Sequence, residues 1–181
     1  MPACVVLAAV AGFSVLAEAL PHPAPLDATE QERTAHAVAA TTLGILSFAH
    51  WPGDPSRVRL CVVGSTLYAD ALLTTRHVAQ AGGRQVLVRQ RAPVDVAADC
   101  DALYLGRMSR EEQREVARRI VGRPELTVGE RHAGCGGASV ICLDIRLSGV
   151  SFEVDLRSLA QSGVRVEPGL LKLSRNLEHR R

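Results

Sequence analysis

The chain has 181 residues, with 21 Lys or Arg, 19 Asp or Glu and a formal net charge of +2. Aromatic residues make up 3% of it and the basic residues are scattered, whereas nucleic-acid-binding proteins concentrate Lys and Arg near aromatic platforms. This composition argues against nucleic-acid binding, and 47% hydrophobic residues suit a folded domain with a substantial core.

The first 19 residues are predicted to be a signal peptide. An uncharged apolar run from Cys4 to Leu16 precedes Ala17-Glu18-Ala19, a small-x-small pattern that signal peptidase accepts. The run is shorter than the roughly 20 residues of a membrane-spanning helix, and no later apolar segment is long enough. We therefore expect an exported protein that does not span a membrane. Residues 20–28, rich in proline, are expected to form an extended linker, and residues 29–181 a single domain.

Helix and strand patterns alternate along this domain. Thr29 and Glu32 form a predicted capping box for an amphipathic helix that ends before Trp51-Pro52-Gly53. Further helices are expected over residues 64–72, after Ser109 as far as Gly122, after Asp155 as far as Gly163, and from Pro168 onward. The expected strands are residues 58–63, 86–88, 102–105 and 126–128, followed by a hairpin of residues 139–145 and 150–154.

The first strand carries an unbroken apolar run, Leu60-Cys61-Val62-Val63. Such a run is typical of a strand buried on both faces of a sheet that helices cover. The order of elements therefore predicts an α/β domain of three layers, with a mixed, mainly parallel sheet, helices on both faces and an antiparallel C-terminal hairpin.

Four cysteines follow the predicted leader, at positions 61, 100, 135 and 142. An even number in an exported protein predicts two disulfides, and sequence alone leaves three pairings open. The layout favours Cys61 with Cys100, which would tie two strands of one sheet, and Cys135 with Cys142, which flank Gly136-Gly137. The first bond would stabilise by roughly 4 kcal/mol and the second by about 2.5 kcal/mol. A second hypothesis is that the short, glycine-flanked bond is exposed and reducible, so that the protein responds to redox state.

Motifs for catalysis are absent from the sequence. There is no zinc-protease helix, no phosphate-binding glycine loop and no nucleophile elbow. The histidines show no paired ligand spacing for a metal. We therefore predict that the protein is not an enzyme and uses neither a metal nor a cofactor.

Several segments, in their order and spacing, resemble the YfiR family of periplasmic repressors, and the cysteine positions resemble those of its pseudomonad members. The segments are Phe48-Ala49-His50-Trp51-Pro52, Leu60 to Gly64, Cys100 to Leu105, Leu126-Thr127-Val128, Gly136-Gly137, Phe152 to Leu156 with Gly163, and Leu170 to Leu173.

This resemblance implies a periplasmic binding protein that represses an inner-membrane diguanylate cyclase by binding its periplasmic sensory domain. Cyclic di-GMP and biofilm formation would then stay low, and an OmpA-like outer-membrane lipoprotein would sequester the repressor. The resemblance also implies disulfides joining Cys61 to Cys100 and Cys135 to Cys142. Whether the protein is a homodimer is left open.

Two surfaces are candidate binding sites. An edge hairpin beside an amphipathic helix can present apolar anchors within a polar rim, which suggests partner contacts at Phe152, Glu153, Leu159 and Leu170. Taken one by one, the apolar residues fit a core position better. The alternative function, a periplasmic small-molecule binding protein, would place a ligand in a cleft at the strand ends near His50, Trp51 and Arg165.

Overall fold

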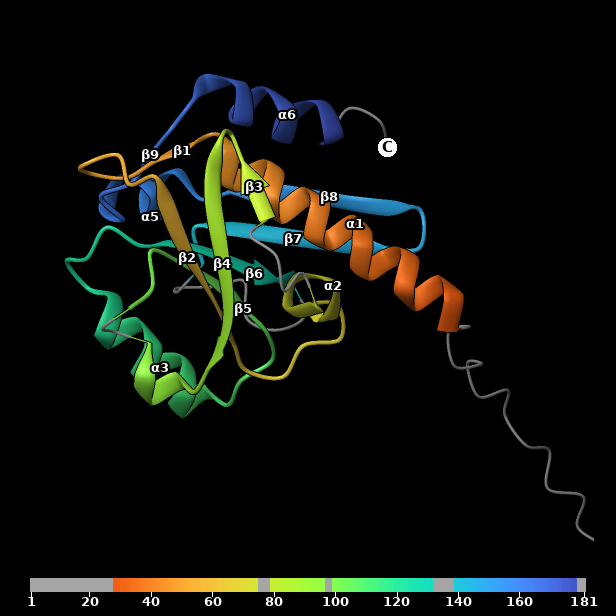
Figure 1. Cartoon of the computed structure of the whole chain (residues 1–181), viewed down its shortest axis with the longest axis horizontal. Helices are drawn as coiled ribbons and strands as arrows, with labels where there is room; N and C mark the ends of the chain where they lie inside the picture. The colour runs from red at the N-terminus through yellow and green to blue at the C-terminus, as the bar shows by residue number, and fades with distance from the viewer. Residues whose placement is uncertain (1–27, 75–78, 97–98, 132–138, 179–181) are drawn as a thin grey trace, which may run out of the picture.

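The computed structural model describes residues 28–74, 79–96, 99–131 and 139–178 (Figure 1). Seven strands of these residues form one sheet in the order β3-β4-β2-β5-β6-β7-β8. Five neighbours in it run parallel, namely β4 (Arg84–Arg91), β2 (Arg57–Val63), β5 (Ala102–Leu105), β6 (Leu126–Glu130) and β7 (Ile141–Arg146). An antiparallel strand closes each edge, β3 (Ala79–Ala81) at one and β8 (Gly149–Val154) at the other. The predicted signal peptide lies outside the described residues.

Helices cover both faces of this sheet. Figure 1 shows α1 (Ala28–Ser47) and α6 (Pro168–Glu178) on one side of it and α3 (Arg110–Ile120) on the other. The short α2 (Asp70–Thr74) packs with α1, and η1 (Pro93–Asp95) packs with α3. A further helix, α5 (Leu156–Gln161), follows the hairpin of β7 and β8. The predicted three-layer α/β architecture with a mixed, mainly parallel sheet is confirmed.

The apolar run in β2 supplies both cores. Leu60 and Val62 belong to the larger core, which α1, α2 and α6 cover, whereas Cys61 and Val63 belong to a smaller core beneath α3. Side chains alternate between the faces of a strand, so four consecutive buried residues need cover on both sides. This explains why β2 lacks the apolar-polar alternation of a strand that has one solvent-exposed face.

The helix boundaries follow the expected capping chemistry in three cases. Ser109 caps α3 with the reciprocal bonds of a capping box, since it accepts from Glu112 N and the Glu112 carboxylate accepts from Ser109 N. Asp155 caps α5 by accepting from the backbone N–H groups of Arg157 and Ser158, and α6 begins at Pro168. The capping box expected at Thr29 is wrong, because α1 begins at Ala28 and Thr29 lies inside its first turn.

The helix expected over residues 64–72 is also largely wrong, because only Asp70–Thr74 is helical. Gly64 has a φ of 83°, and the backbone N–H of Ser65 donates to Arg107 O over 3.0 Å. Arg107 N donates back to Ser65 O over 2.7 Å. These groups bridge the loops after β2 and β5, so they are not available for a helical turn.

Three short strands were not expected. β1 (Ala49–His50) pairs antiparallel with β9 (Arg165–Val166), and β3 pairs with β4 through a turn at Gly82-Gly83. Segments of two or three residues are too short to show a period in the sequence.

Candidate functional site

A disulfide joins Cys61 in β2 to Cys100, which lies just before the neighbouring strand β5. The two Cα atoms are 5.8 Å apart, and the residues are 1% and 5% exposed. The bond therefore lies inside the smaller core, beneath α3, where solvent does not reach it. Cys142 is disulfide-bonded as well. Cys135 lies outside the described residues, so its pairing with Cys142 stays a prediction.

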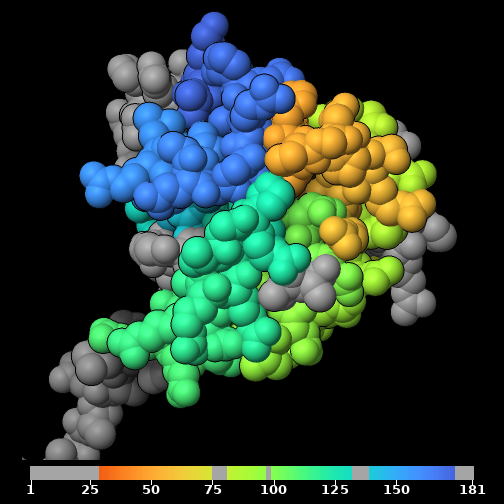
Figure 2. Space-filling model, turned by 90° about the vertical axis from the view of Figure 1, so that its left-hand side faces the viewer, coloured from red at the N-terminus to blue at the C-terminus, as the bar shows by residue number. Residues whose placement is uncertain are grey.

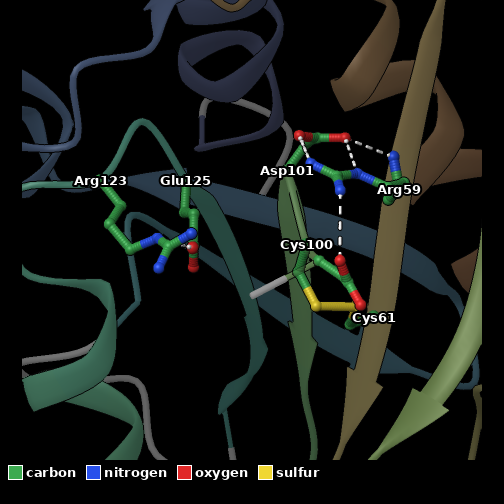
Figure 3. Close-up of a disulfide and its surroundings, with 7 residues drawn as sticks. Arg59, Cys61, Cys100, Asp101, Arg123 and Glu125 are labelled. Atoms are coloured by element: carbon green, nitrogen blue, oxygen red, sulfur yellow. Dashed lines mark hydrogen bonds and ion pairs between the residues drawn. A yellow bond between two sulfur atoms is a disulfide. The ribbon is translucent and has the colours of Figure 1, made fainter. Parts of the chain in front are cut away.

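An ion pair lies beside this disulfide, between Arg59 and Asp101 (Figure 3). The Asp101 carboxylate accepts from Arg59 N at 2.8 Å, from Nε at 3.0 Å and from Nη2 at 2.8 Å. Hydrogen bonding to Asp101 raises the pKa of the Arg59 guanidinium. Because Asp101 N also donates to Arg59 O, side chains and backbone together fix the amino ends of β2 and β5.

Trp51 belongs to the larger core. It is 4% exposed, and its Nε1 donates to Asp101 O over 2.8 Å. Asp101 immediately precedes β5, so Trp51 lies near the amino ends of the parallel strands. Ligand clefts of open α/β sheets form at the carboxyl ends. The expected cleft near Trp51 is therefore at the wrong edge, and the indole ring is not accessible for stacking on a ligand.

His50 and Arg165, the other two candidate ligand residues, face each other in the β1–β9 pair. Both ring nitrogens of His50 have partners, Arg84 Nη2 at 3.1 Å from Nδ1 and Glu167 Oε1 at 2.9 Å from Nε2. Arginine only donates, so Nδ1 accepts and the Nε2 proton points to Glu167. Arg84 also donates to Ala49 O and to Asp54. This network attaches the two-stranded sheet to β4 and leaves His50 no free nitrogen for a ligand.

The four candidate partner residues do not form one surface. Phe152 and Leu170 are 6% and 1% exposed and belong to the larger core. Leu159 is partly buried against the same core. In the described structure Phe152 and Leu170 are core residues and not exposed anchors. The Glu153 side chain is 49% exposed and points to the opposite face of β8 from Phe152.

Glu153 is part of a charged cluster on that face, with Arg131, Asp144 and Arg146. Arg131 Nη2 lies 2.6 Å from Glu153 Oε1, and its Nε lies 3.8 Å from Asp144 Oδ1. Arg146 Nη2 lies 2.8 Å from Asp144 Oδ2. Glu153 is also directly opposite Cys142 in the β7–β8 pairing. The Glu153 cluster, meaning these four charged residues, is thus a polar surface next to a disulfide-bonded cysteine.

Sequence reasoning identified Glu153 but missed the residues around it. Arg131 follows β6 and Asp144 belongs to β7, and only the parallel pairing of these strands brings them to one face. The Arg59–Asp101 pair was missed for the same reason. The sequence signal was an Arg two residues before Cys61 and an Asp directly after Cys100, the two cysteines that the layout paired.

Two negative findings concern the described ranges 28–74, 79–96, 99–131 and 139–178. Within them, no three His, Cys, Asp or Glu side chains are grouped so that they could hold a metal ion. Within the same ranges, no helix has the length and apolar character needed to cross a membrane.

The chain was compared with known protein families. A family described as YfiR/HmsC-like matches residues 35–175. The match extends from α1 into α6 and so includes every strand described above.

Proposed function

The chain belongs to the YfiR/HmsC-like family, and we propose that it represses an inner-membrane diguanylate cyclase by binding the periplasmic domain of that enzyme. Proteins of this family are periplasmic regulators of cyclic di-GMP signalling and not enzymes. The observation that carries the proposal is the family match over residues 35–175, which contain both cores and the Cys61–Cys100 bond. Repression would keep cyclic di-GMP low and restrain biofilm formation.

The proposal includes export and a second partner. Residues 1–19 would be removed as a signal peptide, residues 20–28 would serve as a linker and residues 29–181 would be the active domain. An OmpA-like outer-membrane lipoprotein would sequester the repressor and release the cyclase. Within the family, the four cysteine positions support a close relationship to pseudomonad members.

A binding protein can act across a membrane only by preferring one conformation of its receptor, and the effect is limited by that preference. A rigid binding surface favours such discrimination, because less ordering is needed on binding. The buried disulfide and the Arg59–Asp101 pair hold two central strands together and so support a rigid scaffold.

We place the partner surface at the Glu153 cluster and the start of α5. Glu153 is half exposed, and Leu156, three residues further on, is 57% exposed. Leu156 replaces Phe152 and Leu170 as the apolar anchor, because those two side chains are buried. An exposed leucine three residues along the chain from paired charges has the mixed character of an interface with an apolar centre and a polar rim.

Two charge reversals test this surface. Glu153→Arg places a positive charge against Arg131 and leaves the Glu153 cluster with three positive charges, and the matched control Glu111→Arg reverses an exposed acid on α3. We expect Glu153→Arg to weaken capture of the cyclase from detergent-solubilised membranes by about tenfold or more, since like charges at an interface cost several kcal/mol. Cellular cyclic di-GMP should rise accordingly, whereas the control should behave as the wild type.

The outcomes separate the surface from the function. Equal repression by Glu153→Arg and Glu111→Arg would refute the surface and leave the function standing. If the wild-type mature protein captures no diguanylate cyclase and its deletion leaves cyclic di-GMP unchanged, the repressor function itself is wrong.

We also propose that any redox response arises at Cys142 and not at the buried Cys61–Cys100 bond. Cys142 is disulfide-bonded and lies opposite Glu153, so a change in its bonding would reach the proposed partner surface. Replacing Cys135 and Cys142 with Ser should lower cyclase affinity and make it independent of reductant. Unchanged melting and unchanged affinity in that variant would exclude redox sensing at this bond.

A further inference from the structure

The carboxyl ends of three parallel strands, β4, β2 and β5, meet at one edge of the sheet. From β2 the chain passes to β4 on one side and then crosses to β5 on the other side of β2, so the direction of the connections reverses between β2 and β5. In open α/β sheets, ligands bind outside the carboxyl ends of the strands at such a point. This edge lies opposite the one that holds Trp51 and the His50 network.

A cavity of about 900 Å³ opens at this point. Its described lining residues come from the loop after β2, from the end of β4 with the segment that follows it, and from the loop between β5 and the start of α3. Gly64 directly follows β2 and has a φ of 83°, so the middle strand ends here without a side chain. The cavity therefore has room between groups supplied by β4 and by the loop after β5.

Two arginines line this cavity, Arg91 at the end of β4 and Arg107 shortly after β5. The two strands lie on either side of β2 in the sheet. Arg107 is exposed and Arg91 is half-buried, so solvent reaches both residues. Within the described ranges, neither guanidinium group has an ion-pair partner.

Several arginines elsewhere in the described structure are already paired with acids. Arg123 lines the cavity beside segment 121–125, which is teal between α3 in green and α5 in blue in Figure 2, and it pairs with Glu125 over 3.1 Å. Arg59 likewise pairs with Asp101. The cavity at the carboxyl ends differs from these places because its two positive charges are accessible and not matched by described acids.

Glu112 is the one acid among the described residues that line this cavity. Its Oε2 accepts from Ser109 N over 2.7 Å, and this bond lowers the pKa of Glu112, so the carboxylate is ionised. The described lining residues thus carry two positive charges and one negative charge. One anionic group bound by the arginines balances the excess, whereas a second anionic group on the same ligand would be repelled by Glu112.

We propose that this cavity is a binding site for a small organic phosphate, a monoester whose phosphate pairs with Arg91 and Arg107 while its neutral body lies against Met108. The planar fork of an arginine matches phosphate oxygens with two parallel bonds, and hydrogen bonds between charged groups are the strong ones. The exposed Ser65 can add a neutral hydrogen bond from its hydroxyl group. The volume lies within the range of small-molecule sites.

The test uses the mature chain and three probes: phenyl phosphate, inorganic phosphate and benzyl alcohol. Titrations are followed by backbone amide shifts at about pH 8, where the phosphate is a dianion, and at low ionic strength. We expect saturable binding of phenyl phosphate, about tenfold tighter than that of either other probe. The largest shifts should occur at Gly64, Ser65 and Met108.

Arg91→Gln and Arg107→Gln should each weaken the binding of phenyl phosphate by about tenfold, because each removes charged donors. Their Tm should stay that of the wild type, since neither side chain has an ion-pair partner among the described residues. The matched control Arg57→Gln removes an exposed arginine at the amino end of β2 and should bind as the wild type does. Ser65→Glu places a carboxylate in the cavity and should abolish binding, whereas Ser65→Gln, of similar size, should retain it.

Four results would each overturn the proposal. Three of them are equal binding of benzyl alcohol, unchanged affinity in both Arg91→Gln and Arg107→Gln, and no saturable shift with phenyl phosphate. The fourth is an equal loss of affinity in Arg57→Gln, which would show general charge attraction and no site at this cavity. If inorganic phosphate binds as tightly as phenyl phosphate, the assignment of an organic ligand is wrong. None of these results bears on cyclase repression, so the two proposals fail independently.

Discussion

Removal of the Cys61–Cys100 bond is the sharpest test of how the sheet is held together. We consider the double substitution of both cysteines by Ala. The bond closes a loop of 39 residues in sequence separation, and the chain-entropy relation for that length gives about 4 kcal/mol at 25 °C. Both sulfurs are buried in the smaller core, so the two substitutions also remove packing contacts there.

A loss of about 4 kcal/mol is a large share of the 5–15 kcal/mol that keeps a typical domain folded. It corresponds to a Tm decrease on the order of 10 °C for a domain of this size. Urea titration followed by far-UV circular dichroism measures the loss directly. The m-value should rise, because a denatured chain without the crosslink exposes more surface on unfolding.

Reductant provides the internal control. In the wild type, reductant should remove the stabilisation from both disulfides. In the double variant it should remove only the stabilisation from the bond of Cys142. A loss below about 1 kcal/mol with an unchanged m-value would refute the reasoning, because it would mean that the denatured chain is compact around residues 61–100 without the bond.

Three further predictions concern stability. Glu125→Gln should be more stable than the wild type by about 3 kcal/mol above pH 7 and equal to it near pH 4. Because the pKa of Glu125 is raised in the folded state, the stability of the wild type falls as pH rises from about 4.5 to 7. Urea titrations at several pH values check this. Gly106→Ala should cost about 2 kcal/mol, because its Cβ would collide with Ser65 O, and calorimetry should show a lower Tm. Asp155→Ala should cost about 1 kcal/mol in the same urea assay, because two backbone N–H groups of α5 lose their acceptor.

The sequence by itself determined the α/β class, the mainly parallel character of the sheet, the C-terminal hairpin and most helix starts. These features depend on local patterns that are long enough to read. Leu60 to Val63 is apolar throughout because the strand is buried on both faces. Ser109 with Glu112, and Asp155, mark helix starts because they satisfy nearby backbone donors. The preference for pairing Cys61 with Cys100 followed from expecting both at strands of one sheet.

Only the tertiary structure decided which side chains are available for binding. Phe152 and Glu153 are neighbours in the chain, yet one is buried in the core and the other lies in a charged cluster, because successive side chains of a strand point to opposite faces. Trp51 is buried because Asp101, fifty residues away, accepts its indole N–H. Glu125 is buried beside residues of α3 and α5, where its carboxylate pairs with Arg123 over 3.1 Å. Alternation along a strand can be read locally, but which face is covered and which residues lie beside a side chain depend on distant elements that pack together, and no local pattern in the chain records that.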